Sequence, residues 1–231
     1  MSTPSSHTRG SERPRRDPDA NGQIHLGDGI VRELNASSRP GKGEILVKVF
    51  TDAMTAYGDG DLDKAVRLGE QAKQLALRST NVREFLGLAY YASERWKEAA
   101  RELAAFRRMS GSTAQNHVIA DCYRAQGKPE KALEYCDDMD MTVPEEVHYE
   151  GQIVAAGALA DMGRLEDAVG RLLRLDLTPN EVSEHHLRVW YVLADLLERL
   201  GRFTQARRWF QAVVDNDAEL TDATERLAKL R

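Results

Sequence analysis

The sequence lacks features that several classes of protein require. Its two cysteines, Cys122 and Cys136, are too few for a disulfide framework or a four-ligand zinc site, so we expect reduced thiols in a cytoplasmic protein. The arginines near the N-terminus are not followed by the apolar segment that a secretory signal needs. The longest nearly apolar run, 153–160, is far shorter than the roughly 20 residues that cross a bilayer as a helix. We therefore expect neither export by that route nor a membrane span.

A surplus of positive charge is also missing. The formal net charge is −5, and 30% of the residues are charged. Residues 1–43 contain seven Lys and Arg against five Asp and Glu, net +2, which leaves 25 against 32 in the rest of the chain, net −7. General nucleic-acid binders present a positive field to phosphates. The acidic balance therefore argues against nucleic acid as the main partner.

Proline is rare after residue 43, and apolar residues recur there at spacings of three and four. This pattern predicts amphipathic helices over 44–231. Residues 1–23 are rich in Ser, Pro, Arg and Asp, without such periodicity, and are predicted to be disordered. Residues 24–43 are predicted to be a linker that contains at most a turn or two of helix and could act as a docking element, because glycine and proline flank its apolar stretch. Residues 1–43 are thus expected to form a basic and polar tail and linker.

A repeat is visible in the helical region. Small alanines recur at intervals of 34, 33, 36 and 38 residues, at Ala65, Ala99, Ala132, Ala168 and Ala206. The last repeat carries the clearest set of regularly spaced residues, namely Trp190, Leu193, Ala194, Leu197, Gly201, Ala206 and Phe210. This set resembles the signature of the tetratricopeptide repeat, a helical hairpin with a period of about 34 residues.

The resemblance covers about 45–231 and implies an all-α fold, a right-handed α-solenoid of tetratricopeptide-like hairpins with a C-terminal capping helix. The implied units are repeats at about 45–78, 80–112, 113–146, 149–182 and 187–218, with the cap at 219–231. The segments 82–88 and 120–124 are also similar to an actinobacterial-type group of repeat proteins. The family is defined by its architecture and not by a shared chemistry. The resemblance therefore implies a concave binding surface and says nothing about a substrate.

Small residues have two expected roles in this fold. Gly87, Ala120, Ala156 and Ala194 are predicted to lie where the two helices of a hairpin cross. Glycine at 60, 127, 163 and 201 is predicted to close the turn between them, since a residue after a helix often needs positive φ. Glu94 replaces that glycine in one repeat, so we expect its turn to be closed differently.

In tetratricopeptide proteins the first helix of each hairpin lines the groove. Carried onto this sequence, the resemblance implies a partner-binding groove of Glu84, Leu88, Tyr91, His117, Asp121, Arg124, Ile153, Gly157, Arg188, Tyr191, Asp195 and Glu198. The groove is mixed in charge, with a tyrosine toward either end. It offers no Lys or Asn, so a clamp for an acidic chaperone tail is not expected. Simple solvation is the competing interpretation of each polar residue here.

The sequence contains only weak matches to the motifs of metal-binding and catalytic sites. Asp59, Asp61, Asp63 and Glu70 match four positions of a calcium-binding EF-hand loop, but Lys64 stands where the loop needs glycine. Among His117 with Asp121, the pair His185–His186 and the two cysteines, only His117 and Asp121 share a helical face by their spacing. No glycine-rich phosphate loop or nucleophile elbow is present. We expect no catalytic residue, no metal and no cofactor.

The favoured function is a cytoplasmic, non-enzymatic adaptor or scaffold that binds a peptide or helix of a partner protein in its concave groove. The alternative is a regulatory nucleic-acid-associated module that uses the arginines of the N-terminal tail. An enzyme ranks third because no constellation of residues supports it. Self-association through the outer face stays open.

Overall fold

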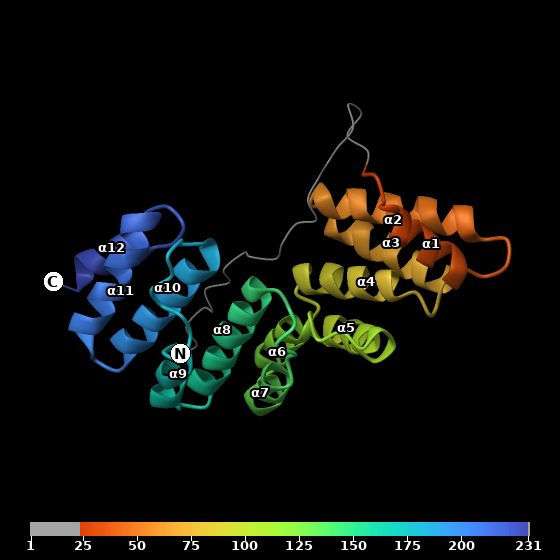
Figure 1. Cartoon of the computed structure of the whole chain (residues 1–231). Helices are drawn as coiled ribbons and strands as arrows, with labels where there is room; N and C mark the ends of the chain where they lie inside the picture. Colours follow the sequence, from red (N-terminus) through yellow and green to blue (C-terminus); the bar gives the residue numbers. More distant parts are fainter. Residues whose placement is uncertain (1–23, 231) are drawn as a thin grey trace. The chain divides into compact units, whose positions relative to one another are not determined.

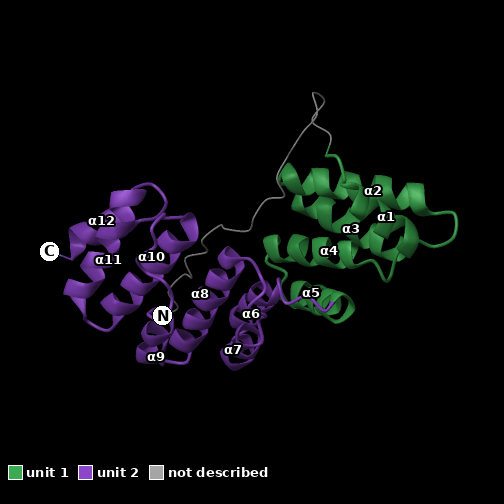
Figure 2. Cartoon of the chain, in the orientation of Figure 1, with its two compact units in different colours: residues 1–110 green, residues 111–231 purple. Residues whose placement is uncertain are grey.

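A computed structural model describes residues 24–230, and the predicted disorder of 1–23 lies outside these residues. Within the described range the chain forms twelve α-helices and no strand, which confirms the all-α prediction (Figure 1). The chain divides into two compact units, which meet in the sequence between Ser110 and Gly111 (Figure 2). The sequence pattern did not predict this division. None of the described helices is long and apolar enough to cross a membrane.

Unit 1 contains two helical hairpins preceded by a short helix. Its helices are α1 (Asp28–Ser37), α2 (Gly43–Gly58), α3 (Leu62–Leu75), α4 (Thr80–Ala92) and α5 (Trp96–Ser110). Helices α2 and α3 pair, as do α4 and α5, and α3 packs on α4. Leu46, Phe50 and Val82 lie in one buried cluster. Burial of such side chains stabilises each by about 1.5–3 kcal/mol relative to exposure.

Helix α1 is longer than the turn or two predicted within 24–43. It spans ten residues, and its Leu34 is fully buried in the core cluster of unit 1. The carboxylate of Glu33 accepts hydrogen bonds from the backbone N–H of Thr80 at 2.8 Å and from Ser79 Oγ at 2.8 Å, at the start of α4. The N–H of Thr80 is one of the backbone groups that a helix start leaves without an intrahelical partner. The helix is longer than the flanking glycine and proline predict, because residues more than forty positions away stabilise it.

Unit 2 contains three hairpins and a final short helix. Its helices are α6 (Asn116–Ala125), α7 (Pro129–Asp137), α8 (Glu145–Asp161), α9 (Leu165–Leu172), α10 (Glu184–Arg199), α11 (Phe203–Asn216) and α12 (Ala223–Lys229). Consecutive helices pair as α6 with α7, α8 with α9, and α10 with α11, and α12 packs on α11. Leu172, Leu193 and Phe210 are buried in a cluster that continues from α8 to α12. Cys122 and Cys136 are buried, as small apolar residues would be.

The turn at Glu94 is closed in the same way as the glycine turns. Glu94 has φ of 57°, and its N–H donates to the carbonyl of Tyr91 while the next N–H donates to Tyr90. Gly127 has φ of 70° and makes the same pair of bonds one repeat later. The expectation of a different closure was therefore wrong. The hydrogen bonds of the turn hold a residue with a side chain in a conformation that costs roughly 1–2 kcal/mol.

The predicted helix crossing at Gly87 is confirmed in unit 1. A Cβ atom added to Gly87 of α4 would lie 2.5 Å from the side chain of Leu103 and 3.2 Å from its backbone nitrogen in α5. The corresponding alanines of unit 2, at 120, 156 and 194, are fully buried. Small residues at these positions let the helices approach closely.

The acidic segment that partly matches a calcium loop belongs to the turn between α2 and α3. Asp61 is the N-cap of α3, and its carboxylate accepts a hydrogen bond from the N–H of Lys64 at 3.1 Å. Asp63 lies in the first turn of the same helix, where a negative charge is favourable. These two carboxylates thus serve the helix start.

Candidate ligand-binding face

The first helices of the hairpins in unit 2 lie next to one another. Helix α6 packs against α8, and α8 packs against α10 (Figure 1). These three helices carry the unit 2 members of the predicted groove, all half-buried: His117, Asp121, Arg124, Ile153, Gly157, Arg188, Tyr191, Asp195 and Glu198. We call this set, with the ion-pair partners described below, the ladder face. Partial exposure of successive side chains from parallel elements is what a surface for an extended ligand requires.

The other three predicted residues lie on α4 in unit 1. Glu84, Leu88 and Tyr91 are all half-buried there. The ring of Tyr91 packs edge-on against the ring of Trp96, with centroids 5.4 Å apart. Their role in binding stays a prediction that concerns unit 1 alone.

The first ion-pair link of the ladder face connects α6 to α8. Nε of Arg124 lies 2.8 Å from the carboxylate of Asp161, and a terminal guanidinium nitrogen lies 3.2 Å from Asp121 on its own helix. Gly157 makes room for this guanidinium, because a Cβ atom there would lie within 2.7 Å of three of its atoms. The missing side chain at 157 thus lets Arg124 lie across α8.

The second link connects α8 to α10 and is more deeply buried. Arg188 pairs with Glu150 at 2.9 Å, and both side chains are less than one fifth exposed. Burial raises the pKa of Glu150 to about 7, although the Arg188 cation acts in the opposite direction. His117 lies near this pair, and burial lowers its pKa to about 4, so its imidazole is neutral at physiological pH.

The third link connects α10 to the final helix. Arg226 of α12 pairs with Asp195 at 2.9 Å and with Glu198 at 2.6 Å. The hydroxyl of Tyr191 donates to Asp222 at 2.5 Å, just before α12 begins. Burial and this carboxylate both raise the pKa of Tyr191. The α10 end of the ladder face is therefore in contact with the capping helix.

The sequence interpretation missed Glu150, Asp161, Asp222 and Arg226 as members of this face. The sequence spacing could have indicated Glu150 and Asp161, because positions 150, 153, 157 and 161 share one side of a helix. Extending the predicted face of α8 by one turn in each direction would have included them. No comparable signal pointed to Asp222 and Arg226, since the last helix was interpreted only as a cap.

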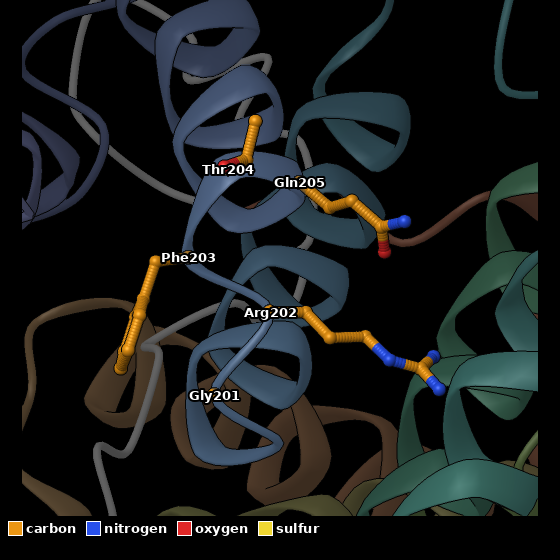
Figure 3. Close-up of a pocket in the computed structure, with 5 residues that line it drawn as sticks. All are labelled: Gly201, Arg202, Phe203, Thr204 and Gln205. Carbon is orange, nitrogen blue, oxygen red and sulfur yellow. The ribbon is translucent and has the colours of Figure 1, made fainter.

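Two other features, a buried cysteine and a surface depression, are weaker candidates for a functional site. Burial raises the pKa of the Cys136 thiol to about 12, so this cysteine is not a reactive nucleophile at neutral pH. An open depression at the turn between α10 and α11 is lined by five consecutive residues, 201–205 (Figure 3). In Figure 3 the side chain of Phe203 points to the opposite side of the ribbon from those of Arg202 and Gln205. This depression contains none of the predicted site residues.

The paired helices and the row of first-helix side chains define a helical-repeat protein of the kind built from two-helix units. The profile of the tetratricopeptide repeat matches residues 86–141 and 153–220, which is more than half of the sequence. The chain belongs to the tetratricopeptide-repeat family. A search of curated protein sequences finds no match.

Solved structures with a similar fold support the same architecture. The apo form of the quorum sensor NprR from B. thuringiensis has a TM-score of 0.66 at 14% identity, over 81% of this chain and 58% of that one. The thermophilic protein TTC0263 from Thermus thermophilus has a TM-score of 0.58 at 18% identity, over 80% and 98% of the two chains. YrrB, described as having an unusual peptide-binding site, has a TM-score of 0.54 at 16% identity, over 78% and 91%. At these identities the likeness shows the fold alone.

Proposed function

We propose that this protein is a non-enzymatic scaffold whose ladder face binds an extended peptide or a helix of a partner protein. The observation that carries the proposal is the row of half-buried polar side chains on α6, α8 and α10. YrrB, which shares the fold, is described as having a peptide-binding site, and this supports the same role here. Glu84, Leu88 and Tyr91 of α4 are proposed as a separate contact in unit 1. The expected cytoplasmic location remains a prediction from the cysteine content.

The charges of the ladder face favour a basic ligand. Its guanidinium groups, on Arg124, Arg188 and Arg226, are all engaged by carboxylates of the face. The carboxyl groups are twice as many, namely Asp121, Glu150, Asp161, Asp195, Glu198 and Asp222. Arg199 reaches Asp195 at 3.8 Å, and carboxyl groups still outnumber arginines when it is included. A surplus of carboxylates attracts Lys and Arg side chains of a partner and repels acidic segments.

The same surplus disfavours the two alternatives that involve anions. Phosphates of a nucleic acid and the carboxylates of an acidic chaperone tail would both meet paired arginines and additional negative charge. No described residue on the ladder face offers a cation outside an ion pair. The charges of the ladder face therefore disfavour the nucleic-acid alternative.

Selection of binders from a random peptide library on the full chain tests the proposal. We expect the selected peptides to be rich in Lys and Arg and their affinity to fall as salt is raised. Asp161→Asn together with Glu198→Gln should weaken the best peptide by about tenfold, which is a loss of about 1.4 kcal/mol.

Glu166→Gln is the matched control for these variants. Glu166 lies on α9, the second helix of its hairpin, is exposed and pairs with Arg202, so one carboxylate charge is removed off the ladder face, against two on it in the double variant. This control should leave peptide affinity unchanged. Selection of acidic peptides, or an equal effect of Glu166→Gln, would show that the ladder face is not the binding surface.

A further inference from the structure

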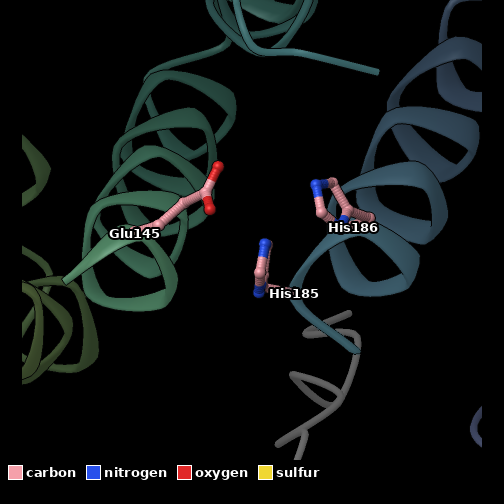
Figure 4. Close-up of side chains that lie close together, drawn as sticks. All are labelled: Glu145, His185 and His186. Atoms are coloured by element: carbon pink, nitrogen blue, oxygen red, sulfur yellow. The ribbon is translucent and has the colours of Figure 1, made fainter. Parts of the chain in front are cut away.

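Three side chains with metal-binding groups meet at the N-terminal ends of α8 and α10 in unit 2. Glu145 is the first residue of α8, and His185 and His186 lie in the first turn of α10. One carboxylate oxygen and one nitrogen of each imidazole lie within 4.8 Å of one another. Figure 4 shows the carboxylate and the two rings directed toward a common point. The packing of α8 against α10 creates this cluster.

The imidazole of His185 is suited to coordinate an ion. Nε2 of His185 is buried and makes no hydrogen bond within the part of the chain that the structure describes. A buried nitrogen in this state is unfavourable unless something else binds it.

The ring of Tyr149 fixes the orientation of both histidines. Its centroid lies 4.7 Å from that of His185 and 5.2 Å from that of His186, in edge-on contacts. Its hydroxyl donates to the backbone carbonyl of Asp176 at 3.2 Å, which holds the tyrosine itself in place. Ligands whose orientation is set by a surrounding shell bind metals more tightly.

We propose that Glu145, His185 and His186 form a binding site for a divalent transition-metal ion of the zinc class. Two imidazole nitrogens and one carboxylate oxygen are ligands typical of Zn²⁺, whose bonds to them measure about 2.0–2.2 Å, and water completes a tetrahedral set. Because Glu145 is exposed, its side chain can rotate to shorten the ligand spacing. Mg²⁺ and Ca²⁺ require oxygen ligands and are poorly matched. This site is independent of peptide binding by the ladder face.

Metal binding would change how α10 begins. Nδ1 of His186 accepts a hydrogen bond from the backbone N–H of Ser183 at 3.0 Å, so the proton of the neutral ring is on Nε2. Coordination through Nε2 requires that proton to leave to solvent and Nδ1 to take one up, which leaves the ring neutral. A protonated Nδ1 cannot accept from Ser183. The ion therefore links α8 to α10 and releases the Ser183 N–H.

Calorimetric titration of the metal-free, tag-free full chain tests the site. We expect one Zn²⁺ to bind per chain, with no comparable heat from Mg²⁺. Glu145→Gln and His185→Gln should each raise the dissociation constant at least about tenfold. His148→Gln is the matched control, because His148 lies one turn along α8 but outside the cluster, and it should bind as the parent does.

A second measurement distinguishes loss of a ligand from loss of fold. Glu145→Gln changes an exposed side chain, so its melting temperature without metal should equal that of the parent while the rise on adding Zn²⁺ disappears. Hydrogen exchange of the Ser183 amide should accelerate when Zn²⁺ binds. The proposal is overturned if Zn²⁺ gives no binding heat, if Glu145→Gln binds as tightly as the parent, or if His148→Gln loses binding equally.

Discussion

Replacement of Glu102 by glutamine should destabilise unit 1 strongly. Glu102 of α5 is 1% exposed, and its carboxylate pairs with Arg83 of α4 at 2.5 Å and with Lys73 of α3 at 3.2 Å. Arg101 contacts it at 3.2 Å from the exposed side. Removal of one partner from a buried ion pair costs about 3–5 kcal/mol, because the remaining charge is left without compensation. Here that charge is Arg83, since Lys73 keeps the carboxylate of Glu70 at 2.6 Å. Since glutamine can still accept one hydrogen bond, we expect the lower end, about 3 kcal/mol.

The same substitution at Glu98 is the matched control. Glu98 lies one turn earlier on α5 and pairs with Arg95 at 2.7 Å, but both side chains are about a third or more exposed. An exposed pair of this kind contributes about 0.2–1 kcal/mol. The two variants therefore make one chemical change at one buried and one exposed position of the same helix.

Urea unfolding, combined with hydrogen exchange of α4 and α5, measures both effects within unit 1. The pH dependence gives a second test, because burial alone would raise the pKa of Glu102 while the Arg83 and Lys73 cations outweigh it and lower the pKa. A lowered folded-state pKa contributes stability above the ordinary value of 4.5, and this contribution is lost as the pH falls. The cost of Glu102→Gln should therefore shrink in acid. Equal costs at positions 98 and 102 would refute the reasoning.

Three further predictions concern single positions. Gly87→Ala should lower the unfolding free energy by about 1–3 kcal/mol, measured by urea titration, because the added Cβ meets Leu103; an unchanged midpoint would contradict the close crossing. Glu94→Gly should raise the melting temperature slightly, since relief of roughly 1–2 kcal/mol of strain exceeds the entropy that glycine adds to the unfolded chain. The Glu150 carboxyl should titrate near pH 7 in carbon NMR, and Arg188→Gln should raise its pKa further. Because the folded-state pKa exceeds the ordinary 4.5, the associated stability is present in acid and lost as the pH rises through about 7.

The repeat pattern predicted the hairpins because its signals are local. Apolar spacing, the recurring alanines and a glycine at each turn act within about one period of the sequence. Gly87 and Gly127 have in the structure the close crossing and positive φ expected of them. The same local reasoning failed at Glu94, where the hydrogen bonds of the turn override the preference of the residue.

The candidate site was predicted only in outline. Nine residues of the ladder face were placed on the first helices by the repeat register, and the structure finds them half-buried there. Their partners could not be predicted from spacing, because Arg124 and Asp161 are 37 residues apart and meet only through the packing of α6 on α8. The cluster of Glu145 with His185 and His186 has the same origin.

Periodicity by itself determined that this chain forms stacked helical hairpins, since burial of an apolar stripe every third or fourth residue requires nothing beyond the neighbouring repeat. Tertiary structure alone decided that α1 joins unit 1 through Leu34 and Glu33, and which charges on the first helices meet. The physical reason is distance along the chain. Side-chain pairing between helices depends on how the helices cross, and the local sequence pattern does not specify which polar groups that crossing brings together.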